Sequence, residues 1–218
     1  MPLAEQHTDN PHTSAPSRSF YVLGDTAHVW NDIPGRDSVL AVCVDRDLSG
    51  GTFELDCESH ALGALAEAWL VERGADPSRF TDLTEIAAAD QETERIVELL
   101  RGAGPDRFAV HDQYTYDEDP YDVWVIATDT HNTGSAPVRV FHEQRQIDSS
   151  TYTLREGHFA TLDDAWEWTT DPSSPLPPAP PSPSARAAAA RPGTSSLVGG
   201  PVAGAPPAAA PAPRSRRR

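Results

Sequence analysis

The stretch Phe108–Glu143, FAVHDQYTYDEDPYDVWVIATDTHNTGSAPVRVFHE, decides the fold. It contains three runs rich in β-branched and aromatic residues, and a fourth run follows it: Phe108–Tyr116, Val123–Asp129, Val138–Glu143 and Tyr152–Glu156. Turn-forming segments separate these runs: Asp119-Pro120, Asn132–Ser135 and Asp148–Ser150. Short strands joined by such turns are typical of an antiparallel meander, so we expect one here.

Strand patterns also occur nearer the N-terminus. Ser19–Leu23 and Ala27–Trp30 are short candidates, and Ser38–Asp45 (SVLAVCVD) is a valine-rich run that suits a buried strand. Thr52–Cys57 alternates apolar and polar residues, which predicts a strand with one wet face. Because Ser49–Gly51 lies between the last two runs, they are expected to form a hairpin.

A helical period replaces the strand pattern between these two groups. Ser59 is the expected cap of a helix that ends near Arg73 and Gly74, with Leu62, Leu65 and Trp69 on one face. A second helix is expected to begin at Asp82, which with Glu85 resembles a capping box, and to end at Gly102. Its predicted apolar stripe consists of Ile86, Ala89, Ile96, Val97 and Leu100.

A last short helix is predicted after the meander. Thr161 is its expected N-cap, and Ala165 with Trp166 or Trp168 is expected to pack on the sheet. The strands and helices are segregated along the chain, which favours an α+β fold over a doubly wound parallel sheet. We therefore predict a mostly antiparallel sheet with two central helices and a short C-terminal helix.

Composition divides the chain into three parts. Residues 1–18 are polar and lack apolar periodicity, so they are expected to be a disordered lead-in. Residues 19–170 carry the strand and helix patterns and are expected to form one acidic α+β domain. Residues 171–218 are rich in proline and alanine and finish in the basic end RSRRR, which predicts a disordered tail.

The charge is distributed unevenly between these parts. The whole chain has a net charge of −16, whereas residues 19–170 hold 30 acidic and 10 basic side chains, a net of −20. A surface this negative repels phosphate backbones and anionic lipid, so we expect no direct nucleic-acid binding by the domain and no membrane partner. A basic protein is the partner class that the charge favours.

Several enzyme classes lack the residues that they need. All 17 basic residues are arginine, so a Walker A loop, a Schiff-base lysine and a kinase-type lysine are excluded. The sequence also contains no GxSxG, no SxxK and no GxGxxG pattern. We expect no cofactor, and these absences favour a binding protein over an enzyme.

The cysteines and the N-terminus bear on the compartment. Cys43 and Cys57 do not form a CxxC pair and lie among strand-like neighbours, so buried reduced thiols are expected. A disulfide between them stays open if the protein is exported. The first residues contain no apolar segment typical of a signal peptide, which predicts a cytoplasmic protein.

One loop has the spacing of a calcium-binding loop. In the segment 45–56, DRDLSGGTFELD, oxygen ligands would come from Asp45, Asp47, Ser49, the Gly51 carbonyl and Asp56. The flanks are strand-like rather than helical, and a hairpin turn rich in Asp, Ser and Gly explains the same residues. We therefore expect no metal here and keep these five residues only as a candidate calcium site.

A second cluster combines a histidine with several carboxylates. His111, Asp112, Asp117 and Asp119 are close in sequence, and such groups can bind a divalent metal or perform acid–base catalysis. Their spacing matches no metal signature, and solvated acids commonly collect in loops.

Two functions follow as hypotheses. The first is a bacterial accessory or protein-interaction module whose acidic surface or exposed sheet edge meets a basic protein. The alternative is a small hydrolase, with or without a metal, that uses the acidic cluster near residues 111–122.

Overall fold

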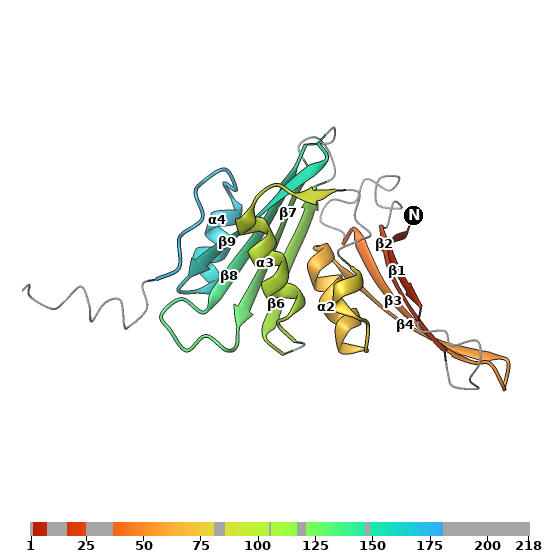
Figure 1. Ribbon diagram of the computed structural model, residues 1–218. Helices are drawn as coiled ribbons and strands as arrows, with labels where there is room; N and C mark the ends of the chain where they lie inside the picture. The colour runs from red at the N-terminus through yellow and green to blue at the C-terminus, as the bar shows by residue number, and fades with distance from the viewer. Residues whose placement is uncertain are drawn as a thin grey trace, which may run out of the picture. The chain divides into compact units, whose positions relative to one another are not determined.

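Two sheets and three α-helices make up the described part of the chain, which confirms the α+β prediction (Figure 1). The computed structural model describes residues 2–7, 17–24, 37–80, 86–104, 106–116, 121–146 and 149–180. The predicted strand at Ala27–Trp30 lies outside these residues. None of the described helices is long and apolar enough to cross a bilayer.

The first sheet is antiparallel and has the order β1-β2-β3-β4. Its strands are β1 (Pro2–His7), β2 (Ser17–Gly24), β3 (Val39–Asp47) and β4 (Thr52–His60). The predicted β3–β4 hairpin is confirmed, with Asp47 opposite Thr52 across the turn. Gly51 adopts a φ of 65° in this turn, a left-handed conformation that favours glycine. Strand β1 lies within the predicted lead-in.

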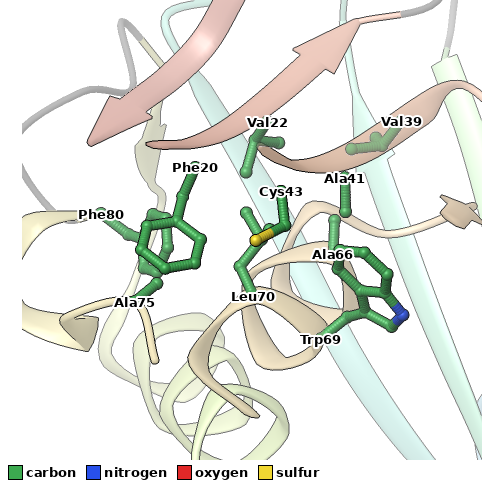
Figure 2. Packing of buried hydrophobic residues seen from close by; sticks show 10 residues of the cluster. All are labelled: Phe20, Val22, Val39, Ala41, Cys43, Ala66, Trp69, Leu70, Ala75 and Phe80. Atoms are coloured by element: carbon green, nitrogen blue, oxygen red, sulfur yellow. The ribbon is translucent and has the colours of Figure 1, made fainter. Parts of the chain in front are cut away.

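Helix α2 (Gly63–Glu72) packs on one face of this sheet. The buried cluster between them also takes side chains from the segment that follows α2, which includes the 3-10 helix η1 (Pro77–Arg79). Figure 2 shows its ten members: Phe20, Val22, Val39, Ala41, Cys43, Ala66, Trp69, Leu70, Ala75 and Phe80. The Trp69 ring lies at the edge of the cluster, with its indole nitrogen turned away from the other side chains (Figure 2).

The predicted cap of this helix is wrong, whereas its predicted end is confirmed. Ser59 continues strand β4, because β4 pairs with β3 as far as His60 opposite Val39. Leu62 is the N-cap and makes no side-chain capping bond. At the other end, Arg73 is the C-cap and Gly74 has a φ of 101°.

The second sheet has the order β5-β9-β8-β7-β6. It consists of β5 (Ala87–Ala88), β6 (Phe108–Tyr116), β7 (Tyr121–Asp129), β8 (Val138–Arg145) and β9 (Thr151–Phe159). Strands β6 to β9 form the predicted antiparallel meander, and β5 adds a short parallel pairing to β9.

Helices cover both faces of this meander. Helix α3 (Gln91–Arg101) packs through Ile96 and Leu100 on a cluster that includes Val123, Phe141 and Leu154. Ala64 in the first turn of α2 and the N-cap Leu62 join the same cluster, so α2 contributes to the cores of both sheets. On the other face lies α4 (Leu162–Thr169), which packs through Ala165 and Trp168 on Ile126 and Val140; the Thr161 cap is confirmed.

The predicted start of the second helix is wrong. Asp82 and Glu85 lie outside the described residues, but Ala87 and Ala88 form strand β5 rather than helix. The amide of Ala87 donates to the carbonyl of Ser150, and that of Ala89 to the carbonyl of Tyr152. These contacts with β9 outweigh the helical spacing of the sequence. The helix begins at Gln91, where the Asp90 carboxylate caps it by accepting from the Thr93 amide.

The compact unit continues to Pro180, beyond the predicted domain boundary. The indole of Trp168 donates to the Ser174 carbonyl, and the amide of His158 in β9 donates to the Pro177 carbonyl. Leu176 packs against the cluster under α4. A Cβ on Gly157 would lie 2.6 Å from the Leu176 side chain, so a larger residue there would force Leu176 to shift. Residues 172–180 therefore lie against part of the β9 edge.

Candidate functional site

Strand β4 is a long edge strand with a different chemistry on each face. It spans nine residues, and among the described strands it pairs only with β3. Phe53, Leu55 and Cys57 alternate with Glu54, Asp56 and Glu58 along it. The pairing of Asp56 with Cys43 and of Glu58 with Ala41 places the acidic residues on the face that α2 covers. The apolar residues therefore face away from α2.

The apolar side chains of β4 are open to solvent. Phe53 is 73% exposed and Leu55 is 56% exposed. Leu55 pairs with Val44 and Cys57 pairs with Val42, so the apolar stripe continues on β3. Grouped exposed apolar residues on an unpaired strand edge mark an interaction site or an aggregation hazard.

This exposure corrects the prediction of one wet face for Thr52–Cys57, because every residue of that stretch is exposed. It also corrects the expectation of two buried thiols: Cys43 is buried, but Cys57 is exposed. The two cysteines lie on opposite faces of the sheet and are both free.

Helix α2 holds the acidic face of β4 in place. The Trp69 indole donates to Glu58 over 2.6 Å, and Arg73 donates to Asp56 over 2.8 Å. The Arg73 guanidinium also stacks on the Trp69 ring, 3.4 Å from its centroid. Glu54, further along β4, is exposed. The strand is thus fixed near its C-terminal end and presents carboxylates along one side.

A pocket of about 290 Å³ adjoins the acidic face of β4. Its lining comes from β4, α2, the end of α3 with the residues that follow it, and β6: Glu58, His60, Leu65, Ala68, Trp69, Glu72, Arg73, Leu100, Ala103, Gly104, Phe108 and Val110. Apolar side chains thus line much of the pocket, with the polar groups of β4 and α2 beside them. That combination is typical of a binding pocket.

His60 is the unusual polar group of this pocket. Its Nε2 atom is buried and has no hydrogen-bond partner. Its ring meets Trp69 edge to face at 6.5 Å, and the nearest Glu58 oxygen is 3.9 Å from Nε2. Burial lowers the pKa of His60, which favours a neutral ring at pH 7. A buried ring nitrogen without a hydrogen-bond partner lowers the stability of the folded protein.

A larger, open depression of about 710 Å³ lies along β9. It is lined by charged side chains of α3, β8 and β9 and by residues 172–179: Glu92, Arg95, His142, Gln144, Arg155, Glu156, His158, Pro172, Ser173, Ser174, Leu176, Pro178 and Ala179. Although this depression is the larger of the two, we favour the region at β4, where the edge strand exposes Phe53 and Leu55.

The pairs around the depression form a chain across the sheet. Arg95 binds Glu92 at 2.8 Å and Glu156 at 3.0 Å, and Arg139 binds Glu156 at 2.9 Å. Arg139 also contacts His158 and binds Asp129. Arg107 binds the same Asp129 carboxylate, so all three residues belong to this network. A charged ligand would have to displace these contacts, so we interpret the chain as structural.

The residues of the candidate calcium loop are engaged by other groups. Asp47 accepts from the amides of Ser49 and Gly50 and from the Ser49 hydroxyl, which forms the hairpin turn. Asp45 binds Arg18, and Asp56 binds Arg73. Within the described ranges, no three His, Cys, Asp or Glu side chains are arranged to hold a metal ion.

The acidic cluster of the hydrolase hypothesis is described in part. His111 lies at a bulge of β6, and its Nε2 is 2.8 Å from the Thr128 hydroxyl. Asp112 accepts from the Trp166 indole at 3.2 Å and from the Gln113 amide. Asp117 and Asp119 lie outside the described residues.

Sequence reasoning missed the pocket at β4. Trp69 was expected as a core residue, and neither Glu58 nor His60 was a candidate for any site. The pocket brings β4 and α2, which are neighbours in the sequence, together with the end of α3 and with β6, which come later in the chain. The alternation in Thr52–Cys57 was the available signal, but it does not state which face a helix will cover.

No match was found when the sequence was compared with protein-family models, with curated proteins and with solved structures.

Proposed function

We propose that this protein is a non-catalytic interaction module that binds an extended segment of a basic protein along β4. The observation that carries the proposal is the open β4 edge, with exposed Phe53 and Leu55 on one face and Glu54, Asp56 and Glu58 on the other. An added strand would bond to the β4 backbone, and its side chains would alternate between the two faces. The preferred segment alternates basic and apolar residues.

The other edges of the described sheets support the choice of β4. The β1–β2 pairing has an irregularity next to Pro2, and β6 has a bulge at His111. The edge of β9 is met by β5 and by Pro177. Bulges, prolines and covering segments protect sheet edges from further pairing. By contrast, β4 keeps an unbroken register with β3 from Thr52 to His60.

A second copy of the chain fits β4 less well than a basic partner does. Antiparallel self-pairing centred on Asp56 would place Asp56 opposite its own copy and Glu54 opposite Glu58. Like charges directly opposite each other destabilise a pair of strands. The net charge of −16 adds long-range repulsion between copies.

The test uses a peptide as long as β4 that alternates arginine and valine. We expect it to bind the full chain, and the Phe53→Ser/Leu55→Ser variant to bind about tenfold more weakly because apolar contact is lost. Glu54→Gln/Glu58→Gln should also weaken binding and reduce its dependence on salt. Isothermal titration calorimetry at low and high salt measures both effects.

Matched controls separate strand addition from charge attraction. Glu94→Gln/Asp163→Asn removes two exposed acids on α3 and α4 and should leave the affinity nearly unchanged. A peptide with alternating N-methylated residues keeps its charge but cannot form the strand ladder, so it should bind poorly. Equal binding of the N-methylated peptide, or of a glutamate–valine peptide, would contradict the proposal.

A further inference from the structure

The pocket beside β4 has carboxylates from two different elements. Glu58 comes from β4 and Glu72 from the last turn of α2, and both residues line the pocket. The Glu58 side chain is 56% exposed and the Glu72 side chain is 42% exposed. A group that enters the pocket from solvent can therefore contact both carboxylates.

The groups around the pocket carry a negative charge overall. Among the lining residues that the structure describes, Arg73 is the one arginine, and it binds Asp56 over 2.8 Å and lies 3.7 Å from Glu72. Burial lowers the pKa of the lining residue His60, which favours a neutral ring at pH 7. Asp56, Glu58 and Glu72 thus outnumber the single charge of Arg73, so the pocket attracts a further cation.

The rest of the lining suits the apolar part of a long side chain. Leu65, Phe108 and Val110 line the pocket together with the two acids. A basic side chain has a methylene stem that packs on apolar groups and a charged head that reaches polar ones. The volume of about 290 Å³ is just below the usual range for sites that hold a whole small molecule, so a single side chain is a suitable occupant.

The pocket adjoins one end of the β4 edge. Glu58 and His60 line it, whereas Glu54 at the other end of the strand does not. In a strand added to β4, alternate side chains project to the face that carries Glu58. The residue opposite Glu58 has its Cβ about 5 Å from that of Glu58, so its side chain lies beside the pocket.

Arginine fits this position better than lysine does. Its planar guanidinium has five N–H donors and can bind several carboxylate oxygens at once, whereas the lysine ammonium acts as a point charge. We propose that the pocket holds one arginine of the segment that adds to β4, with its stem on Leu65 and Phe108 and its guanidinium at Glu58 and Glu72. This inference rests on the proposed function and names the residue that fixes the register of the bound segment.

The experiment titrates the full chain with a peptide that alternates threonine and valine and has one arginine in place of its central threonine. A matched peptide has citrulline there, which keeps nearly the same shape without the charge. By isothermal titration calorimetry, we expect the arginine peptide to bind about tenfold more tightly than the citrulline peptide, with a lysine peptide between them. Glu72→Gln should reduce the tenfold preference to about threefold, because Glu72 belongs to the pocket but not to β4.

A control variant separates the pocket from general charge attraction. Glu54→Gln removes an exposed acid on the same face of β4 but outside the pocket, so it should leave the preference for arginine nearly unchanged. Equal effects of Glu54→Gln and Glu72→Gln would overturn the inference. Equal affinities for the arginine and citrulline peptides would overturn it too, while strand addition at β4 would stand. If the arginine–valine peptide also fails to bind, the proposed function fails with it.

Discussion

Replacing Arg101 with methionine should lower the free energy of unfolding by about 3–5 kcal/mol. Arg101 in α3 binds Glu67 in α2 at 2.6 Å and 2.8 Å, and both side chains are more than nine-tenths buried. Burial raises the pKa of Glu67, while the Arg101 guanidinium opposes that rise. Without Arg101, the Glu67 carboxylate must stay buried without a partner or take up a proton. Urea denaturation of both proteins measures the loss.

The double variant Glu67→Leu/Arg101→Met provides the critical comparison. Removing both charges takes away the uncompensated group, so much of the lost stability should return. Arg155→Met is a matched control, because the partly exposed pair Arg155–Asp90 contributes much less than a buried pair does. Equal losses in the free energy of unfolding for Arg101→Met and Arg155→Met would contradict the prediction that the buried Arg101–Glu67 pair contributes more than a partly exposed pair.

Replacing Glu143 with glutamine should stabilise the protein at pH 8 by roughly 1–3 kcal/mol and change little at pH 5. Glu143 lies on β8 directly between Val123 and Leu154, which are fully buried under α3. Burial raises the pKa of Glu143 to about 7, although Arg145 opposes the rise. The carboxylate also raises the pKa of Tyr152, which burial has already raised.

The direction of the pH effect follows from proton uptake. Since the pKa of Glu143 is about 7 in the folded state and about 4.5 when unfolded, the folded protein binds more protons between these values. The contribution of Glu143 to stability should therefore fall as the pH rises from about 4.5 to 7 and then level off. Some exposed area remains on Glu143, and this contact with water favours the lower half of the stated range.

Thermal denaturation from pH 5 to pH 8 measures the Glu143 effect. Glu167→Gln removes an exposed acid on α4, so its plot of melting temperature against pH should run parallel to that of the wild type. A Glu143→Gln plot that also runs parallel to that of the wild type would contradict the prediction.

The meander and the helix ends were accessible from the sequence because local rules decide them. Phe108–Tyr116 carries β-branched and aromatic residues in a run that its neighbours on the chain can pair with directly. Thr161 has the side chain that an N-cap requires, and Gly74 can adopt a positive φ. These choices depend on residues that are close in sequence, so patterns of a few residues suffice.

The start of α3 and the choice of which face of β4 is covered were not accessible from local patterns, because residues distant in sequence decide them. Ala87 joins β9 through the Ser150 carbonyl, and no pattern near Ala87 contains that information. The apolar residues of β4 resemble a core face, yet the register with β3 turns Asp56 and Glu58 toward α2. The pocket around His60 depends on where the end of α3 and β6 lie relative to β4 and α2, and no local pattern in the sequence contains that information.

The contrast between β4 and the shielded edges has a consequence at high salt. Among the described strands, β4 is the edge without a bulge, a proline or a covering segment, and repulsion between the acidic molecules keeps two such edges apart. Salt screens that repulsion, including the repulsion between Glu54, Asp56 and Glu58 and the same residues of a second β4. Light scattering should therefore detect dimers first at high salt, and growth should stop at two molecules because pairing uses the β4 edge of each.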